Sequence, residues 1–226
     1  MSRFFSETVS CPECSASNSV RIWESINVAL DPDMKGKVLD FSLFVFTCEK
    51  CGSSTKLLFP LLYHNMSNSY MVNMVFPENE GDLSRTLSDI SNLFLSIQAF
   101  SSDMSLVGRD YRFRAVFNPV ELAEKIRIFD NGFDDRAIEI MKQDLFEQFD
   151  SEVNGGGIAD ILFDFSSGRP MFVTLFNNGQ QTLCHFSRTT YLGIVNNMRE
   201  SYGRFSSGGC EIIDRNWARE FIAATE

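Results

Sequence analysis

The sequence predicts an α+β fold in which strands and helices occupy separate stretches of the chain. Strand-like segments fill residues 1–80 and return after residue 157, whereas apolar residues between them recur at helical spacing. The chain has 226 residues, of which 44% are hydrophobic, so it can bury a substantial core. We therefore expect three regions: an N-terminal sheet (1–80), a helical region with one strand (81–150) and a C-terminal antiparallel meander with two helices (151–226).

Residues 1–80 are predicted to form a small antiparallel sheet. The segments 20–28 and 41–47 are extended, and the stretch 31–40 between them reads as a turn followed by a short helix. Residues 57–65 and 70–76 are rich in strand-forming side chains and flank a turn-prone Met-Ser-Asn, so they are predicted to form a hairpin.

The region 81–150 opens with a predicted amphipathic helix capped by Asp82. Its apolar stripe is expected to face the core and consists of Leu83, Leu87, Ile90, Phe94 and Ile97. Residues 100–110 read as a loop, and the alternation over 111–117 predicts a strand.

A helix hairpin is predicted next. Asn118 can cap its first helix, with Glu121 completing a capping box, and Gly132 can end that helix in a left-handed conformation. The second helix is expected over about 134–149. These signals place two antiparallel helices in the centre of the chain.

The segment 152–158 contains three consecutive glycines and is the expected linker to the last region. After it, three strands separated by two turns predict a meander over 161–186. A helix is predicted over 189–202, and Asp214 is the expected cap of a final helix.

Four cysteines form two C-x-x-C pairs, CPEC at 11–14 and CEKC at 48–51. Zn²⁺ prefers four soft ligands in a tetrahedron, and each C-x-x-C turn presents two thiolates to one point. Cys11, Cys14, Cys48 and Cys51 are therefore predicted to bind one structural zinc ion and to make the N-terminal sheet zinc-ribbon-like. Four protein ligands leave no position for a catalytic water.

The alternative interpretation of CPEC is a redox dithiol. Such a motif needs a helix immediately after the first cysteine, but polar turn residues and then a strand pattern follow Cys14. Cys184 and Cys210 have no C-x-x-C partner, and Cys184 is expected to be a small buried residue.

These motifs support a family resemblance. The combination of CPEC, SINV (25–28), FTCEKCG (46–52) and LLYHN (61–65) resembles the CpXC domain family of bacteria and archaea, and EKIRIFDNGFDDRAIEIMK (124–142) is similar to a segment of the same proteins. The resemblance covers roughly residues 8–145. It implies a zinc-ribbon-like fold and no particular reaction.

Other polar residues have a structural interpretation beside a functional one. His64 could serve as an acid or base but is more simply a turn residue or hydrogen-bond donor near the cysteines. Asp134, Asp135 and Arg136 begin a predicted helix, where carboxylates cap free N–H groups. Cys184 and His185 are neighbours on a strand and therefore point to opposite faces. No nucleotide-binding, serine-hydrolase or metalloprotease motif occurs.

The net charge of -10, with no basic segment, argues against nucleic acid as a partner. No signal peptide and no apolar run long enough for a membrane span is recognisable, so a cytoplasmic protein is expected. The favoured function is non-enzymatic: a zinc-stabilised protein that interacts with another protein or with itself. The alternative is a hydrolase-type enzyme whose site assembles from His64, Asp110, Asp134 and Arg136.

Overall fold

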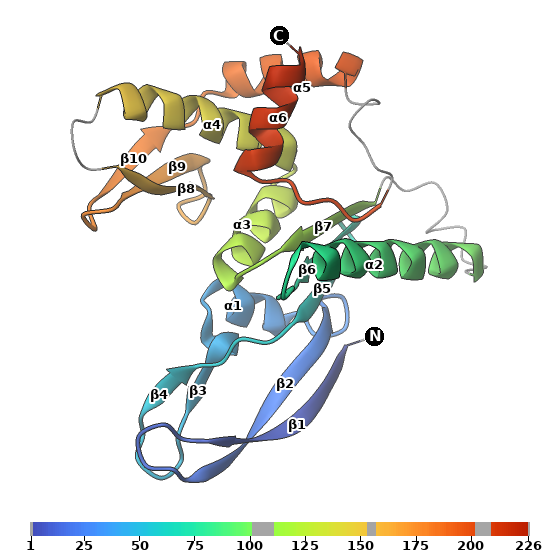
Figure 1. The fold of residues 1–226 in the computed structure, drawn as a ribbon, viewed down its shortest axis with the longest axis vertical. Coiled ribbons are helices and arrows are strands. Elements are labelled where there is room, and N and C mark those ends of the chain that lie inside the picture. The colour runs from blue at the N-terminus through green and yellow to red at the C-terminus, as the bar shows by residue number, and fades with distance from the viewer. Residues whose placement is uncertain (1, 101–110, 153–156, 202–208, 226) are drawn as a thin grey trace. The chain divides into compact units, whose positions relative to one another are not determined.

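The computed structural model describes residues 2–100, 111–152, 157–201 and 209–225. The α+β class is confirmed: strands come first, helices follow, and an antiparallel meander lies near the C-terminus (Figure 1). The chain divides into two compact units, Met1–Ala123 and Glu124–Glu226. The expected boundaries near residues 80 and 150 stay predictions, and most of the glycine linker lies outside the described residues.

The first unit is built on a five-stranded sheet with the order β1-β2-β5-β6-β7. Its strands are β1 (Arg3–Ser10), β2 (Ser17–Asn27), β5 (Leu61–Asn65), β6 (Tyr70–Met74) and β7 (Arg112–Val116). The pairs β1–β2 and β5–β6 are antiparallel, as expected for hairpins. The pairs β2–β5 and β6–β7 are parallel, so the sheet is mixed.

Parallel pairing arises because long crossover segments separate these strands. Residues 28–60 connect β2 to β5, and α2 (Glu80–Phe100) lies in the connection from β6 to β7. The strand predicted over 111–117 is present as β7 and forms the last strand of this sheet. The centre of the sheet is well buried, with Ile26, Tyr63, Tyr70 and Val72 fully covered.

The connection from β2 to β5 carries a second, two-stranded sheet. After α1 (Asp33–Leu39) come a short 3₁₀ helix, η1 (Ser42–Phe44), and the antiparallel strands β3 (Val45–Thr47) and β4 (Ser54–Lys56). The strand predicted over 41–47 is thus shorter than expected. Phe41 adopts a left-handed φ of 64°, which ends α1 with a turn and delays the start of β3.

Helix α2 begins slightly earlier than predicted. Asn79 is the cap in place of Asp82: its Oδ1 accepts from the Asp82 N–H at 3.0 Å, and Asp82 Oδ2 accepts in turn from the Glu78 N–H at 3.2 Å. The predicted stripe is not fully covered, because Leu83, Leu87 and Ile90 are each only partly buried. The side chains of Phe94 and Ile97 lie outside the described residues.

The predicted helix hairpin is confirmed as α3 (Pro119–Asp130) and α4 (Asp135–Glu152). The Asn118 Oδ1 accepts from the N–H of Glu121 at 3.0 Å, and Glu121 Oε2 accepts from the N–H of Phe117 at 2.7 Å. This is a capping-box arrangement displaced by one residue. Gly132 has a φ of 74° and donates to the Phe129 carbonyl, which ends α3 as expected.

The second unit packs helices against the three-stranded meander β10-β9-β8. Its elements are the rest of α3, α4, β8 (Ile158–Asp164), β9 (Met171–Phe176), β10 (Gln181–His185), α5 (Arg188–Ser201) and α6 (Arg215–Thr225). Asp214 caps α6 by accepting from the Trp217 N–H at 2.9 Å, as predicted. The aromatic rings of Phe133, Phe163, Phe186 and Tyr191 pack on one another in its core.

Candidate metal centre

The four predicted cysteines come together at the tips of two hairpins. Cys11 and Cys14 lie in the turn between β1 and β2, and Cys48 and Cys51 lie in the turn between β3 and β4. The Sγ atoms of Cys11 and Cys51 are 3.7 Å apart, as are those of Cys14 and Cys48. All four sulfurs lie within 4.8 Å of one another.

These separations fit a metal ion better than a disulfide. A disulfide has an S–S distance of about 2.05 Å, and all four cysteines are free thiols. In a regular tetrahedron with Zn–S bonds of about 2.3 Å, neighbouring sulfurs lie about 3.8 Å apart. The four side chains are therefore positioned to hold one metal ion.

The two cysteine turns have the same backbone geometry. In the first turn the Cys11 carbonyl accepts from the Ser15 N–H, and the Cys11 N–H donates to the Ala16 carbonyl, both at 2.9 Å. In the second turn the same two bonds join Cys48 to Gly52 and Ser53, also at 2.9 Å.

Both turns close through a left-handed residue at the same position. Gly52 has a φ of 74°, which suits glycine, and Ser15 adopts a φ of 56° in the first turn. This repeat explains why a glycine follows the second pair of cysteines.

Asn18 connects the two turns. Its side chain is buried, and its Nδ2 donates to the Ala16 carbonyl at 2.8 Å and contacts the Cys48 Sγ at 3.6 Å. Its Oδ1 accepts from the Glu49 N–H at 3.0 Å. No local pattern predicts this role of Asn18, because it depends on the tertiary arrangement that places Asn18 beside the other hairpin.

Hydrogen bonds and burial shift the pKa values of the cysteine thiols in opposite directions. A hydrogen bond from Ser53 lowers the pKa of Cys11 to about 6, and backbone N–H groups, first that of Cys51, lower the pKa of Cys48. A backbone hydrogen bond at Ala16 favours the Cys14 thiolate, but burial and the neighbouring sulfurs outweigh it and raise the pKa of Cys14 to about 12. A bound metal ion would supply the positive charge that favours the thiolate form of all four cysteines.

The surroundings are those of a small apolar cluster. Cys11 and Cys48 are buried and pack with Phe46, and Val9, Ala16, Val20 and Leu57 lie against them. The apolar cluster is small, because it has three buried members and a few partly buried neighbours. Four cysteines are enough to fill the coordination shell of one tetrahedral metal ion, which is the arrangement typical of structural sites.

The remaining cysteines lie elsewhere. Cys184 is partly buried on β10 with its Sγ 3.4 Å from the Thr174 hydroxyl, and Cys210 is buried. Cys184 is thus a little less covered than predicted. Within the described ranges, the four-cysteine cluster is the only group of three or more His, Cys, Asp or Glu side chains arranged to hold a metal.

The residues of the alternative, enzymatic hypothesis have separate structural roles. His64 Nε2 lies 3.0 Å from the Tyr111 hydroxyl, and burial lowers the pKa of His64 to about 4. Asp134 accepts from the Arg136 N–H at 3.0 Å and is ion-paired with the Arg136 guanidinium, as a helix cap would be. Asp110 lies outside the described residues.

Asp135 departs from the expected capping role. It is fully buried and its Oδ2 lies 3.2 Å from the Lys125 Nζ. Lys125 Nζ also lies 3.2 Å from Glu139 Oε1 and donates to the Ile213 carbonyl at 2.6 Å. Sequence reasoning missed this ion pair.

A second buried lysine continues the network. Lys142 Nζ lies 3.2 Å from Glu124 Oε1 and 3.1 Å from Glu139 Oε2. Glu124 Oε1 also accepts from the Phe163 N–H at 2.6 Å. We call these five side chains, Glu124, Lys125, Asp135, Glu139 and Lys142, the buried charge cluster. It joins α3 and α4 to β8 and to the segment before α6.

The balance of charge in this cluster is set by burial and pairing. Burial alone would lower the pKa of each lysine, but the facing carboxylates outweigh it and raise the pKa of both Lys125 and Lys142. Burial raises the pKa of Glu124. One signal for the cluster exists in the sequence: the stretch 124–226 contains two lysines, and both lie within a helical pattern of apolar residues.

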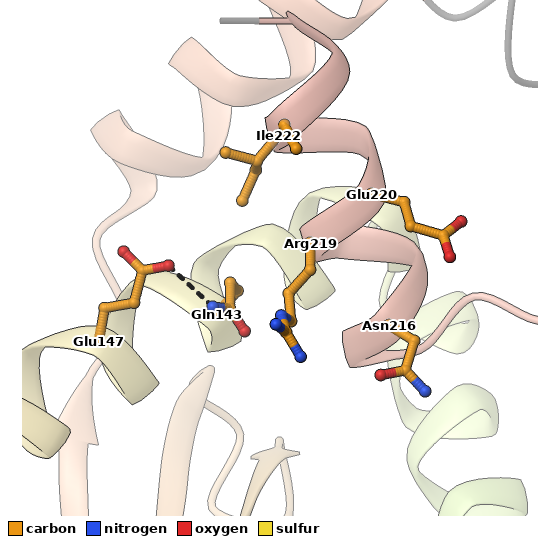
Figure 2. A pocket seen from close by; sticks show the side chains of 7 residues that line it. Gln143, Glu147, Asn216, Arg219, Glu220 and Ile222 are labelled. Atoms are coloured by element: carbon orange, nitrogen blue, oxygen red, sulfur yellow. Dashed lines mark hydrogen bonds between the residues drawn. The ribbon is translucent and has the colours of Figure 1, made fainter.

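Figure 2 shows a pocket of about 660 Å³ between α4 and α6 of the second unit. On α4, Gln143 Nε2 donates to Glu147 Oε1 at 2.8 Å, and Asn216, Arg219 and Glu220 line the α6 side. Among the described residues that line the pocket are two carboxylates and a guanidinium, and none of these residues is Ser, Cys or His.

In the first unit, the tips of two hairpins bring four cysteine sulfurs to positions that could hold one metal ion, as in proteins of the zinc-ribbon type. The chain belongs to the CpXC family, because the family model described as CpXC protein matches residues 9–142. This confirms the resemblance found in the sequence. The match extends from the end of β1 to Lys142 and so includes both the cysteines and most of the two central helices.

The other comparisons found no similar protein. No curated protein and no solved structure matches the chain. Among the helices of the described residues, none is both long and apolar enough to cross a bilayer.

Proposed function

We propose that this chain is a zinc-binding protein of the cytoplasm that works by interacting with another protein or with a second copy of itself. Zinc is the metal that best suits four thiolates in a tetrahedral arrangement. Free thiols in C-x-x-C pairs also suit a reducing compartment.

The four-cysteine shell is the observation that carries this proposal. All four ligand positions of the metal come from the protein, so the ion supports structure and does not activate water. The elements that it joins are two hairpins, one of which presents the free edge of the main sheet. A metal ion in this position would hold the two hairpins in place. It would thus stabilise a surface for association, and it would take no part in a reaction.

Elemental analysis combined with native mass spectrometry tests the metal. We expect one zinc ion per chain, and we expect Cys48→Ser to lose it because three thiolates and a hydroxyl bind zinc far more weakly. Cys184→Ser is the matched control and keeps the metal. Iron in the purified protein, or full zinc retention in Cys48→Ser, contradicts the proposal.

The same measurement tests the interaction. The zinc-loaded chain is expected to give either a mass above that of the monomer or a specific photocrosslink to one defined protein, and Cys48→Ser is expected to lose this association. A zinc-loaded chain that stays monomeric and gives no specific crosslink overturns the interacting role.

A further inference from the structure

Strand β1 forms a free edge of the five-stranded sheet among the described residues of the first unit. Seven of its eight residues are exposed. They include two aromatic side chains, Phe4 and Phe5, which are 49% and 44% exposed. The strand contains no proline or lysine, and the irregularity in its pairing falls on β2, where Glu24 is the extra residue. Proline, lysine and a bulge on the edge strand itself, three features that prevent edge strands from pairing, are therefore absent from β1, and its charged residues are Arg3 and Glu7.

The register of β1 on β2 determines which backbone groups point outward. The two strands pair antiparallel, from Phe4 opposite Trp23 to Ser10 opposite Ser17. Just beyond them, the Cys11 N–H donates to the Ala16 carbonyl. Hydrogen-bonded and non-hydrogen-bonded pairs alternate in such a ladder. The N–H and C=O groups of the even-numbered residues Phe4, Ser6, Thr8 and Ser10 therefore point away from β2.

The side chains of β1 alternate between the two faces of the sheet. Phe4 packs on Trp23, with ring centroids 5.1 Å apart, and lies beneath the Arg21 guanidinium at 4.3 Å. Arg3, Phe5 and Glu7 lie on the other face. This face thus presents a row in which a positive, an aromatic and a negative side chain follow one another.

In an antiparallel pairing of two β1 strands, the outward N–H and C=O groups of even-numbered residues must face each other. This requires a twofold axis that passes through a residue, and we compare three such axes near the middle of the strand. A twofold axis at Glu7 places two carboxylates opposite each other, which is unfavourable. An axis at Ser6 places Phe5 opposite Glu7 and Arg3 opposite Val9. An axis at Phe5 places Phe5 opposite Phe5 and Arg3 opposite Glu7, twice.

The pairing about Phe5 is the most favourable of the three. Phe5 and the Arg3–Glu7 pairs then occupy non-hydrogen-bonded positions, where facing side chains approach most closely. The outward groups of Phe4 and Ser6 bond to each other across the axis. Arg3 Nε already lies 3.5 Å from Glu24 Oε2 within its own chain. In the dimer, Glu7 of the second copy would give the Arg3 guanidinium a second carboxylate partner.

We propose that two copies of this chain associate through antiparallel β1–β1 pairing centred on Phe5, which joins their two five-stranded sheets into one. This rests on the proposed function and specifies its partner as a second copy. The turn that follows β1 carries Cys11 and Cys14, so the metal holds one end of the pairing strand. Most of β1 precedes the family match at residues 9–142, so the proposal concerns this chain and not the whole family.

A charge-reversal experiment tests the register. Sedimentation equilibrium of the zinc-loaded full chain is expected to show a monomer–dimer equilibrium. Glu7→Arg places Arg opposite Arg3, and Arg3→Glu places Glu opposite Glu7, so each is expected to weaken dimerisation at least tenfold. The double variant Arg3→Glu/Glu7→Arg restores attraction and is expected to recover most of it.

Controls separate this effect from misfolding. Arg3 and Glu7 are exposed, so zinc content and thermal unfolding are expected to stay unchanged in all three variants. Glu78→Arg, at an exposed position after β6, changes the net charge by the same amount as Glu7→Arg. It is expected to dimerise like wild type. Ser6→Pro removes an outward N–H and is expected to abolish the dimer while the monomer stays folded.

Several outcomes overturn the proposal. The first is a zinc-loaded wild type that is monomeric at all concentrations. The second is a dimer that still forms in Ser6→Pro. The third is a double variant that does not recover dimerisation. If such a chain still forms a zinc-dependent crosslink to a different protein, the β1 pairing is wrong but the interacting role stands. If it forms none, both proposals fail.

Discussion

At the scale of single residues, the metal centre depends on more than its four ligands. Asn18 binds the backbone of both cysteine turns and contacts the Cys48 sulfur, so it fixes the position of one hairpin tip relative to the other. Groups of this kind orient metal ligands and affect metal affinity although they do not touch the metal. The candidate centre therefore includes the Asn18 amide as well as the four thiols.

Replacing Asn18 tests this role. Asn18→Ala removes both hydrogen bonds, and we expect the zinc affinity to fall by about 10–100-fold. Ser19→Ala, at the exposed neighbouring position on β2, is the matched control and is expected to change the affinity little. Competition with a chromophoric chelator measures both variants. Equal affinity in Asn18→Ala and the control would show that the amide only packs beside the sulfurs.

At the scale of secondary-structure elements, local signals predicted most helices, and long-range pairing was harder to predict. The capping signals at Asn118 and Asp214 and the left-handed Gly132 act within a few residues, so the sequence reveals them directly. The parallel pairing of β6 with β7 joins strands separated by α2, and no local pattern encodes it.

The same distinction applies to the candidate site. C-x-x-C spacing is local, and the four cysteines that it selects as candidate ligands lie together in the structure. Asn18 acts through a partner 30 residues away, and Asp135 binds Lys125 across a helix–helix contact, so both were missed or misassigned. A carboxylate at a helix start can cap the helix or pair with a buried cation, and only tertiary structure decides between these roles.

The buried charge cluster is expected to determine the stability of the α3–α4 hairpin. Lys125→Met leaves Asp135 and Glu139 buried without their shared cation, which costs about 3–5 kcal/mol in comparable cases. We expect a loss of this order in the free energy of unfolding of the second unit. Arg219→Met, an exposed position on α6, is the control and is expected to change it by less than about 0.5 kcal/mol. Urea denaturation followed by Trp217 fluorescence measures both, and equal midpoints would contradict the assignment.

At the scale of the whole molecule, each unit has its own means of holding distant segments together. The first unit joins its two hairpins through four cysteines, and the second joins two helices and a strand through buried ion pairs. Metal binding contributes to folding only where the ligands lie. The stability of the first unit should therefore depend on the metal, and that of the second should not.

The two tryptophans make this difference measurable, because Trp23 lies in the first unit and Trp217 in the second. We expect a strong zinc chelator, or Cys48→Ser, to loosen the segment 8–77 and to shift the emission of Trp23, since β1 and β2 lose their anchored turn. The variants Trp217→Phe and Trp23→Phe isolate the two signals, and hydrogen exchange is expected to rise in peptides from the cysteine turns while those from 124–226 keep their protection. Unchanged protease resistance of residues 8–77 after metal removal would show that apolar packing alone holds the hairpins. Loss of protection in both units would show instead that they unfold as one body and that the metal stabilises the entire chain.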